Sequence, residues 1–270
     1  MRAVVFGGTG QVGRRLIVEM LKSNTTKKVL SLSRSRLYPL EIAVFDRNLS
    51  GHDVHQHMLG KVPKPEDVER ETRRLVRGCT HAFSVVGASR KASDDVIEAV
   101  DGDLVKAFAR GCRDAGTVGH FSLLSQHGAE SSSSDVRLRA KGEAENTVLE
   151  LGFPVTSIYR PYNLLTTLQR SKWKEILLPL LRPVTPPNLR SVSVGDLGKV
   201  MFQNASRIHV NVETDPRHLQ LRWGDNEEDR ARNHSVKEVS VQGGDWDVSE
   251  VSGVILPKDI DRIVNKLKTE

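Results

Sequence analysis

Glycines recur at three-residue intervals near the start of the chain, within the run Gly7-Gly8-Thr9-Gly10-Gln11-Val12-Gly13. An apolar stretch precedes this run, and apolar residues at helical spacing follow it. A glycine turn between a strand and a helix lets backbone amides approach a pyrophosphate, which then lies at the positive end of the helix. The run therefore predicts a dinucleotide-binding turn rather than a turn without a ligand. The residues expected to contact the cofactor there are Gly7, Gly10, Gln11, Val12 and Gly13.

The residues at the end of the next strand predict which dinucleotide binds. A site for NAD usually has an acidic residue about 20 residues after the turn, whereas the 2′-phosphate of NADP calls for an arginine. Here the strand ends in Ser33-Arg34-Ser35-Arg36, without a carboxylate. The planar guanidinium of Arg34 can donate paired hydrogen bonds to a phosphate. We therefore predict NADP(H) as the cofactor, held first by Arg34 and second by Arg36 or Arg14.

Short apolar runs alternate with helical patterns along most of the chain, and they define the elements that must position these residues. The expected strands are 2–6, 29–33, 42–45, 80–86, 120–124 and 155–159, and the expected helices are 12–22, 65–77, 94–115, 137–151 and 257–267. This alternation predicts an α/β fold, a doubly wound parallel sheet of the Rossmann type with ligands at the carboxyl ends of its strands.

The C-terminal part of the chain is less regular. A short helix is expected after 192–196, with Asp196 as its cap, and 207–244 is polar and weakly periodic. We therefore expect a Rossmann domain at 1–205 and a small, partly loop-rich C-terminal lobe at 206–270.

Composition excludes several classes of protein. The net charge is +6 and the pI about 9.4, but basic residues are mixed with acidic ones along the chain, which favours a solvated surface over nucleic-acid binding. The two cysteines, Cys79 and Cys112, lack the spacing of a disulfide framework or a metal site, so a reducing compartment is expected.

Targeting and metal signals are also missing from the sequence. The longest apolar runs, such as Ile176–Leu181, are far shorter than the roughly 20 residues of a membrane span, and no secretion leader is recognisable. His52, His55 and His57 lie in a polar stretch that we interpret as a solvated loop rather than a metal site. The expectation is a soluble, cytoplasmic protein with no bound metal.

Four segments together carry a family resemblance. They are the glycine turn, Val85-Val86-Gly87-Ala88, Phe121-Ser122-Leu123-Leu124-Ser125 and Tyr159-Arg160-Pro161-Tyr162-Asn163-Leu164-Leu165. Over about residues 1–205 the chain resembles the extended or atypical branch of the short-chain dehydrogenase/reductase superfamily. The later segments, with Lys141-Gly142-Glu143-Ala144-Glu145, are most similar to the Tat-interacting-protein oxidoreductase-like group.

The resemblance implies roles for particular residues. In this superfamily a serine orients the substrate carbonyl, a tyrosine transfers the proton, and a lysine four residues later binds the nicotinamide ribose. Ser125 and Lys141 match the serine and the lysine, but Arg137 stands where the tyrosine is expected. An arginine stays protonated and can donate a hydrogen bond to a carbonyl, but it cannot deliver a proton at neutral pH. Loss of a positioned general acid typically costs about 10²- to 10⁴-fold in rate.

Two other residues are candidates for the missing proton donor, namely Tyr162 and His127. Relatives also imply that the segments around Gly87, Ala88, Pro161 and Asn163 lie against the cofactor.

Two functions follow as hypotheses. The first is an NADP(H)-dependent oxidoreductase that acts on a small carbonyl or hydroxyl compound, with weak or atypical catalysis because of Arg137. The second is a non-catalytic regulator in which bound NADPH shapes a surface for a protein partner. Association with nucleic acid or a transcription factor through the basic surface is a third and less favoured hypothesis.

Overall fold

The fold is built on a seven-stranded sheet with the order β11-β6-β5-β4-β1-β2-β3. The computed structural model describes residues 1–38, 42, 54–165, 186, 191–214, 234–241 and 252–269. The strands are β1 (Arg2–Phe6), β2 (Lys28–Ser33), β3 (Val54–Met58), β4 (His81–Ser84), β5 (His120–Leu124), β6 (Val155–Tyr159) and β11 (Gly253–Ile255). All six pairings between them are parallel. The predicted doubly wound α/β fold is confirmed.

The strand order reverses direction at β1. The chain builds outward from β1 through β2 to β3, then returns to place β4 on the other side of β1. The connections that leave β1 and β4 therefore run to opposite sides, and a crevice forms outside the carboxyl ends of these two strands. In doubly wound sheets this switch point is where ligands bind.

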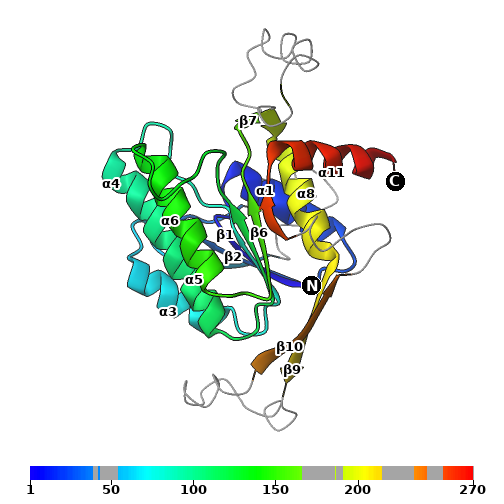
Figure 1. The fold of residues 1–270 in the computed structure, drawn as a ribbon. Coiled ribbons are helices and arrows are strands. Elements are labelled where there is room, and N and C mark those ends of the chain that lie inside the picture. The colour runs from blue at the N-terminus through cyan, green and yellow to red at the C-terminus, as the bar shows by residue number, and fades with distance from the viewer. Residues whose placement is uncertain are drawn as a thin grey trace.

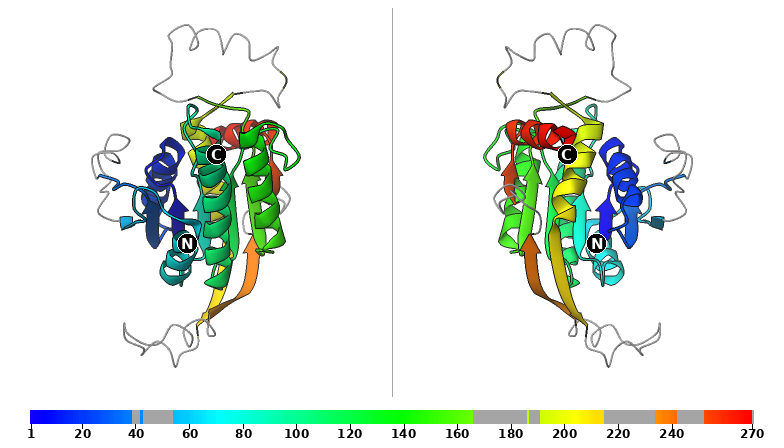
Figure 2. Two further views of the ribbon diagram at one scale, coloured as in Figure 1. Left: turned by 90° about the vertical axis from the view of Figure 1, so that its left-hand side faces the viewer. Right: turned by 90° about the vertical axis from the view of Figure 1, so that its right-hand side faces the viewer.

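Helices cover both faces of the sheet (Figures 1 and 2). On one face lie α1 (Gln11–Lys22), α8 (Val194–Ser206) and α11 (Pro257–Thr269), and on the other lie α3 (Pro65–Leu75), α5 (Leu104–Asp114) and α6 (Val136–Glu150). The short helix α4 (Asp94–Ile97) continues into α5 through a π-helical segment, η2 (Glu98–Asp103).

The side chains of β1 alternate between the two faces of the sheet and contribute to both hydrophobic cores. Ala3 and Val5 are buried in the core beneath α1 and α8, while Val4 and Phe6 are buried in the core beneath α3 and α5. Successive side chains of a strand point to opposite faces, so a strand covered on both faces is apolar throughout. This explains why the central strands were readable from the sequence, with β1, β5 and β6 matching their predicted bounds.

The prediction for the third strand was wrong. The strand that pairs with β2 is β3, which contains His55 and His57 and lies in the stretch that we had interpreted as a solvated loop. Ile42 has helical backbone, and 43–45 and His52 lie outside the described residues. β3 is the edge strand and its side chains are mostly half-buried or exposed, so it lacks the apolar run of a central strand.

The chain beyond 205 contains more regular structure than the sequence indicated. β9 (Ile208–Thr214) and β10 (His234–Val241) form an antiparallel ribbon that extends away from the sheet in Figure 1. β11 then returns to the main sheet beside β6, and α11 packs against α8. The division into a Rossmann domain at 1–205 and a lobe at 206–270 stays a prediction. Strands from both parts of the chain belong to the main sheet.

β7 (Asn163–Leu165) and β8 (Ser191–Ser193) form a small parallel pair that was not predicted. The N-cap of α8 is Ser193 rather than Asp196, since the Ser193 hydroxyl accepts a hydrogen bond from the Asp196 amide at 2.9 Å.

No described helix is both long enough and apolar enough to cross a membrane.

Candidate functional site

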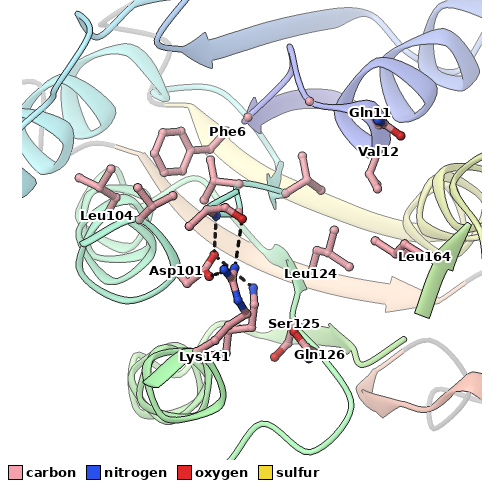
Figure 3. Close-up of a pocket in the computed structure, with 18 of the residues that line it drawn as sticks. Phe6, Gln11, Val12, Asp101, Leu104, Leu124, Ser125, Gln126, Lys141 and Leu164 are labelled. Carbon is pink, nitrogen blue, oxygen red and sulfur yellow. Dashed lines mark hydrogen bonds and ion pairs between the residues drawn. The ribbon is translucent and has the colours of Figure 1, made fainter. Parts of the chain in front are cut away.

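A cavity of about 640 Å³ lies at the switch point of the sheet, over the carboxyl ends of β1, β4 and β5 (Figure 3). Its walls come from the glycine turn, the segment after β4, η2, the end of β5, α6 and the segment after β6. The described residues that line it include Gly7, Thr9, Gly10, Gln11, Val12, Arg34, Gly87, Ala88, Arg90, Asp101, Ser125, Gln126, Arg137, Lys141, Pro161, Tyr162 and Asn163.

The glycine turn has the close geometry that its spacing predicts. Gly7 has a φ of +94°, a conformation that L side chains rarely adopt, and its carbonyl accepts a hydrogen bond from the Gly10 amide at 2.9 Å. A Cβ atom on Gly13 would lie 2.3 Å from the Gly7 carbonyl oxygen, so only glycine fits where α1 crosses the turn. Gly13 therefore packs the helix against the turn and does not itself line the cavity.

The N-terminus of α1 is open toward an anion. Its cap is Gly10, no described side chain accepts hydrogen bonds from its first turn, and that turn carries no acidic residue. The first amides of a helix lack intrahelical acceptors and lie at the positive end of its dipole. Residues Gly10 to Val12 of this turn line the cavity, so these amides suit a bound pyrophosphate.

Arg34 lines the cavity directly after β2, as the sequence predicted. Its side chain is exposed, and the Ser33 hydroxyl donates a 2.6 Å hydrogen bond to the Ser35 carbonyl, which closes the turn that carries it. Arg90 lines the cavity from the segment after β4. Within the described residues neither Arg34 nor Arg90 has an ion pair, whereas Arg14 and Arg36 are not among the lining residues.

Ser125 presents a buried hydroxyl at the end of β5. The residue is 5% exposed, and its backbone amide donates to the Tyr159 carbonyl at 2.8 Å. Its Oγ atom has no hydrogen-bond partner among the described residues. Buried polar atoms are nearly always paired, so this hydroxyl at the cavity wall is available to bond a ligand or a water molecule.

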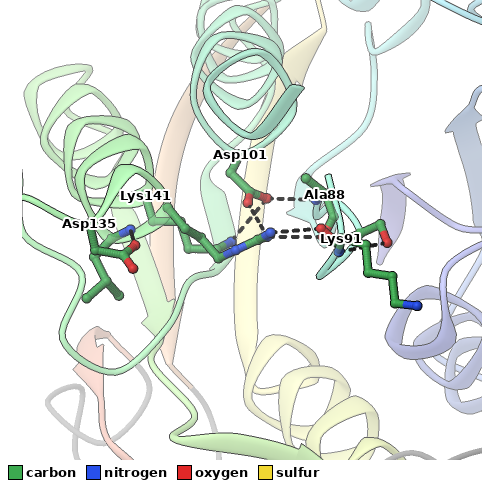
Figure 4. Close-up of polar contacts among 8 residues, drawn as sticks. Ala88, Lys91, Asp101, Asp135 and Lys141 are labelled. Atoms are coloured by element: carbon green, nitrogen blue, oxygen red, sulfur yellow. Dashed lines mark hydrogen bonds and ion pairs between the residues drawn. The ribbon is translucent and has the colours of Figure 1, made fainter. Parts of the chain in front are cut away.

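Arg137 and Lys141 of α6 both contact the carboxylate of Asp101, which Figure 4 shows beside Lys141. Arg137 Nη1 donates to Asp101 Oδ2 at 2.7 Å, and Lys141 Nζ lies 3.5 Å from Asp101 Oδ1. Arg137 also donates to the Ala88 carbonyl at 3.0 Å and to the Ser89 carbonyl at 2.8 Å. Arg137 is therefore occupied by the protein rather than directed at the open cavity.

Asp101 is the site residue that the sequence reasoning missed. It lies in the π-helical segment η2, and its carboxylate is fully buried. One signal was present, since Asp101 shares the apolar phase of Ile97, Leu104 and Phe108 at steps of four, three and four residues. A carboxylate in a buried phase requires a cation or a hydrogen-bond donor.

Tyr162 is the tyrosine that lines the cavity, and it is 42% exposed. Its ring makes an edge contact with the His127 ring at a centroid distance of 5.6 Å, while His127 itself does not line the cavity. Tyr159 is buried, accepts a hydrogen bond from Asn204 at 3.1 Å, and has its pKa raised by burial. Of these two tyrosines, only Tyr162 can reach a ligand.

The segment that carries Pro161 and Asn163 is held by Arg160. Its guanidinium forms a bidentate pair with the buried Glu145 of α6, with Nε 3.0 Å from each carboxylate oxygen. This pair fixes the exit of β6 over α6. Seven of the residues predicted for the site line this one cavity, namely Ser125, Arg137, Lys141, Gly87, Ala88, Pro161 and Asn163. Their contact with a cofactor stays a prediction.

Comparison with known proteins places the chain among NAD(P)-binding oxidoreductase folds. No family model matches the sequence. Protein HTATIP2 from Rattus norvegicus is 34% identical over 171 residues, which cover 62% of this chain and 64% of that protein, just under two thirds. The mitochondrial protein FMP52 from Debaryomyces hansenii is 31% identical over 173 residues, which cover 64% of this chain and 70% of that protein.

Solved structures support the fold alone, at low sequence identity. UDP-glucuronic acid 4-epimerase from Bacillus cereus, in complex with NAD, has a TM-score of 0.53 at 12% identity and covers 76% of this chain and 73% of its own. Triphenylmethane reductase from Citrobacter sp., complexed with NADP(H), has a TM-score of 0.51 at 14% identity and covers 76% of this chain and 66% of its own.

The relatives correct the expectation of a cytoplasmic protein and confirm the resemblance. The FMP52 proteins of Debaryomyces hansenii and Scheffersomyces stipitis are named as mitochondrial, which contradicts the cytoplasmic location predicted from the absence of a readable leader. A mitochondrial transit peptide differs in composition from a secretion leader, so the lack of the latter does not decide between the cytoplasm and the mitochondrion. The chain belongs to the family of FMP52 and HTATIP2, within the extended or atypical branch of the short-chain dehydrogenase/reductase superfamily.

Proposed function

We propose that this chain binds NADP(H) in the 640 Å³ cavity and acts as an oxidoreductase on a small carbonyl or hydroxyl compound. The observation that carries the cofactor assignment is Arg34, which lines the cavity at the end of β2 with no ion-pair partner among the described residues. A guanidinium in that position suits a 2′-phosphate, whereas a site for NAD would place an acid there.

The remaining walls fit the rest of a dinucleotide. The uncapped N-terminus of α1 suits the pyrophosphate, and Lys141 lies at the opposite wall, where the nicotinamide ribose belongs in relatives. When bound, the nicotinamide would supply or accept a hydride. The unpaired Ser125 hydroxyl would orient the oxygen of the substrate.

The site lacks the usual proton donor, because Arg137 stands at the position of the tyrosine. Arg137 cannot deliver a proton at neutral pH, so catalysis depends on another donor. Tyr162 supplies a hydroxyl at the cavity, but its ring is 42% exposed and makes an edge contact with His127. We therefore expect slow turnover, with Tyr162 as the proton donor where turnover occurs.

The cofactor assignment can be tested without knowledge of the substrate. The protein is applied to a resin that carries adenosine 2′,5′-bisphosphate and eluted with either NADPH or NADH. The proposal predicts retention on the resin and release by NADPH at concentrations where NADH releases nothing. Equal release by both dinucleotides would contradict the role of Arg34.

A second function is favoured by the occupied guanidinium of Arg137. Because this residue donates three hydrogen bonds within the protein, the site suits binding better than turnover, as in a regulator that exposes a surface only with NADPH bound. The two functions separate in an assay of NADPH oxidation with a panel of aldehydes, ketones and quinones. Steady turnover that falls in a Tyr162→Phe variant supports the enzyme, and tight NADPH binding without oxidation supports the regulator.

A further inference from the structure

Asp101 is a fully buried carboxylate at which three parts of the cavity wall meet. Its Oδ1 atom accepts the Ala88 amide at 3.0 Å and lies 3.5 Å from Lys141 Nζ. Its Oδ2 atom accepts from Arg137 Nη1 at 2.7 Å. A buried anion is tolerated only when cations and hydrogen bonds compensate for lost water, and Asp101 has both.

The backbone on either side explains this convergence. Arg137 and Lys141 are four residues apart on α6, so their side chains share one helix face. Asp101 faces them from η2, whose π-helical turn shifts the register of the helix at this point. The two segments approach closely, since a Cβ on Gly102 would lie 3.5 Å from the Cβ of Ala140.

Arg137 links this carboxylate to the segment after β4. The same guanidinium that holds Asp101 donates to the carbonyls of Ala88 and Ser89. The Ala88 amide in turn donates to Asp101, which closes a ring of hydrogen bonds around the segment (Figure 4). Gly87, Ala88 and Arg90 line the cavity, so the ring sets the shape of that wall.

We propose that Asp101 and Arg137 act as one unit of positioning residues, which holds Lys141 and the Ala88–Ser89 backbone in place for a bound dinucleotide. The position that relatives give to a proton donor serves here to shape the binding site. This inference rests on the proposed function. It also means that a tyrosine at position 137 would leave the buried Asp101 without its main cation, so a single replacement cannot restore a proton-donor site.

The test is a double-mutant cycle on the full chain, with Asp101→Asn, Arg137→Tyr and both together. Each variant is examined by its melting temperature and by calorimetric titration with NADPH. Removing one partner of a buried pair is strongly destabilising, so we expect each single replacement to lower the melting temperature by about 5 °C or more. Each single replacement should also weaken NADPH binding roughly 10-fold, by the loss of the interaction that orders this wall.

The double variant should lose about as much stability and affinity as the more affected single variant, rather than the sum of both losses, because each replacement breaks the same interaction. Arg137→Lys, which keeps the charge, should retain more affinity than Arg137→Tyr. Additive losses in the double variant, or single variants that lose stability but bind NADPH as tightly as the natural protein, would overturn the proposal.

A matched control exists on the same two elements. Arg139 of α6 pairs with Glu98 of η2 at 3.0 Å, but these side chains are 33% and 51% exposed. Exposed pairs contribute little, so the cycle of Glu98→Gln and Arg139→Tyr should show no coupling in affinity. If the natural protein binds no NADPH, the proposed function fails and the role of the pair in binding fails with it. If the natural protein binds NADPH and the Asp101 cycle shows no coupling, only this inference fails.

Discussion

In the proposed function, one exposed side chain that lines the cavity, Arg34, distinguishes NADP(H) from NAD(H). Its neighbour Arg36 has the same charge but does not line the cavity. The two arginines therefore have different expected roles, because only Arg34 lines the cavity.

Replacing Arg34 with alanine should weaken NADPH binding and leave NADH binding unchanged. A hydrogen bond to a charged group contributes about 1.5–3 kcal/mol, which corresponds to a loss of roughly 10- to 100-fold in affinity. Isothermal titration calorimetry of Arg34→Ala measures this directly. Arg36→Ala is the control and should bind NADPH within about 3-fold of the natural protein. Equal losses in both variants would show a general effect of charge.

Spacing identified the glycine turn, and the family resemblance identified Ser125 and Lys141. The structure brings the turn and these two residues to one cavity, while their roles stay predictions. The spacing of Asp101 indicated burial, but its partners were not predictable, because they depend on the π-helical segment η2 and on the approach of α6. The same holds for Arg137, whose partners were invisible until the fold placed them beside it.

At the scale of elements, the β1–α1 turn is the most constrained part of the site. Gly7 has a positive φ, and Gly13 lies against the Gly7 carbonyl. The helix can pack this closely on the turn because neither residue has a side chain. Gly195 offers a contrast in the first turn of α8, because a Cβ there would meet its nearest neighbour, Ser193 Oγ, at 3.8 Å.

Gly13→Ala should therefore lower the free energy of unfolding by about 1–3 kcal/mol, the usual cost of overpacking, and should abolish NADPH binding because the turn must move. Gly195→Ala should leave the unfolding free energy within about 1 kcal/mol of the natural protein and NADPH binding intact. Chemical denaturation and titration of both variants provide the comparison. A Gly13→Ala protein that binds NADPH normally would show that the close contact does not shape the site.

The elements that the sequence misjudged lie at the two edges of the sheet. β3 was interpreted as a loop and β11 fell in the expected C-terminal lobe, yet both pair in parallel with the main sheet. Edge strands are half-exposed and here carry histidines, glycine and valine rather than a continuous apolar run. Periodicity therefore identifies the centre of such a sheet more easily than its edges.

At the scale of the whole molecule, the β9–β10 ribbon is tied to the sheet through a buried histidine. His81 of β4 donates through Nε2 to the Ile208 carbonyl at 3.0 Å, and its Nδ1 lies 2.8 Å from Thr80 Oγ1. Burial lowers the pKa of His81 to about 4, and burial also holds the pKa of His120 well below its ordinary value. Both rings are therefore neutral in the folded protein near pH 7.

The burial of His81 predicts that the folded protein loses stability at acidic pH. The unfolded chain protonates its histidines near pH 6.5 while folded His81 does so only near pH 4, so the unfolded state binds more protons between these values. The stability contributed by neutral His81 is fully present above pH 6.5 and is lost as the pH falls toward 4, by up to about 3 kcal/mol. Melting temperatures from pH 7.5 to 4.5 should fall more steeply in the natural protein than in His81→Gln. His55→Gln, at an exposed position of β3, should keep the natural slope.

A parallel calorimetric titration of the natural protein with NADPH and with NADH measures the cofactor preference of the site. We expect one molecule of NADPH bound per chain, and an affinity for NADPH at least about 10-fold higher than for NADH, because the proposed partner of the 2′-phosphate, Arg34, lines the cavity. Equal affinity for the two dinucleotides, or binding of neither, would contradict this expectation.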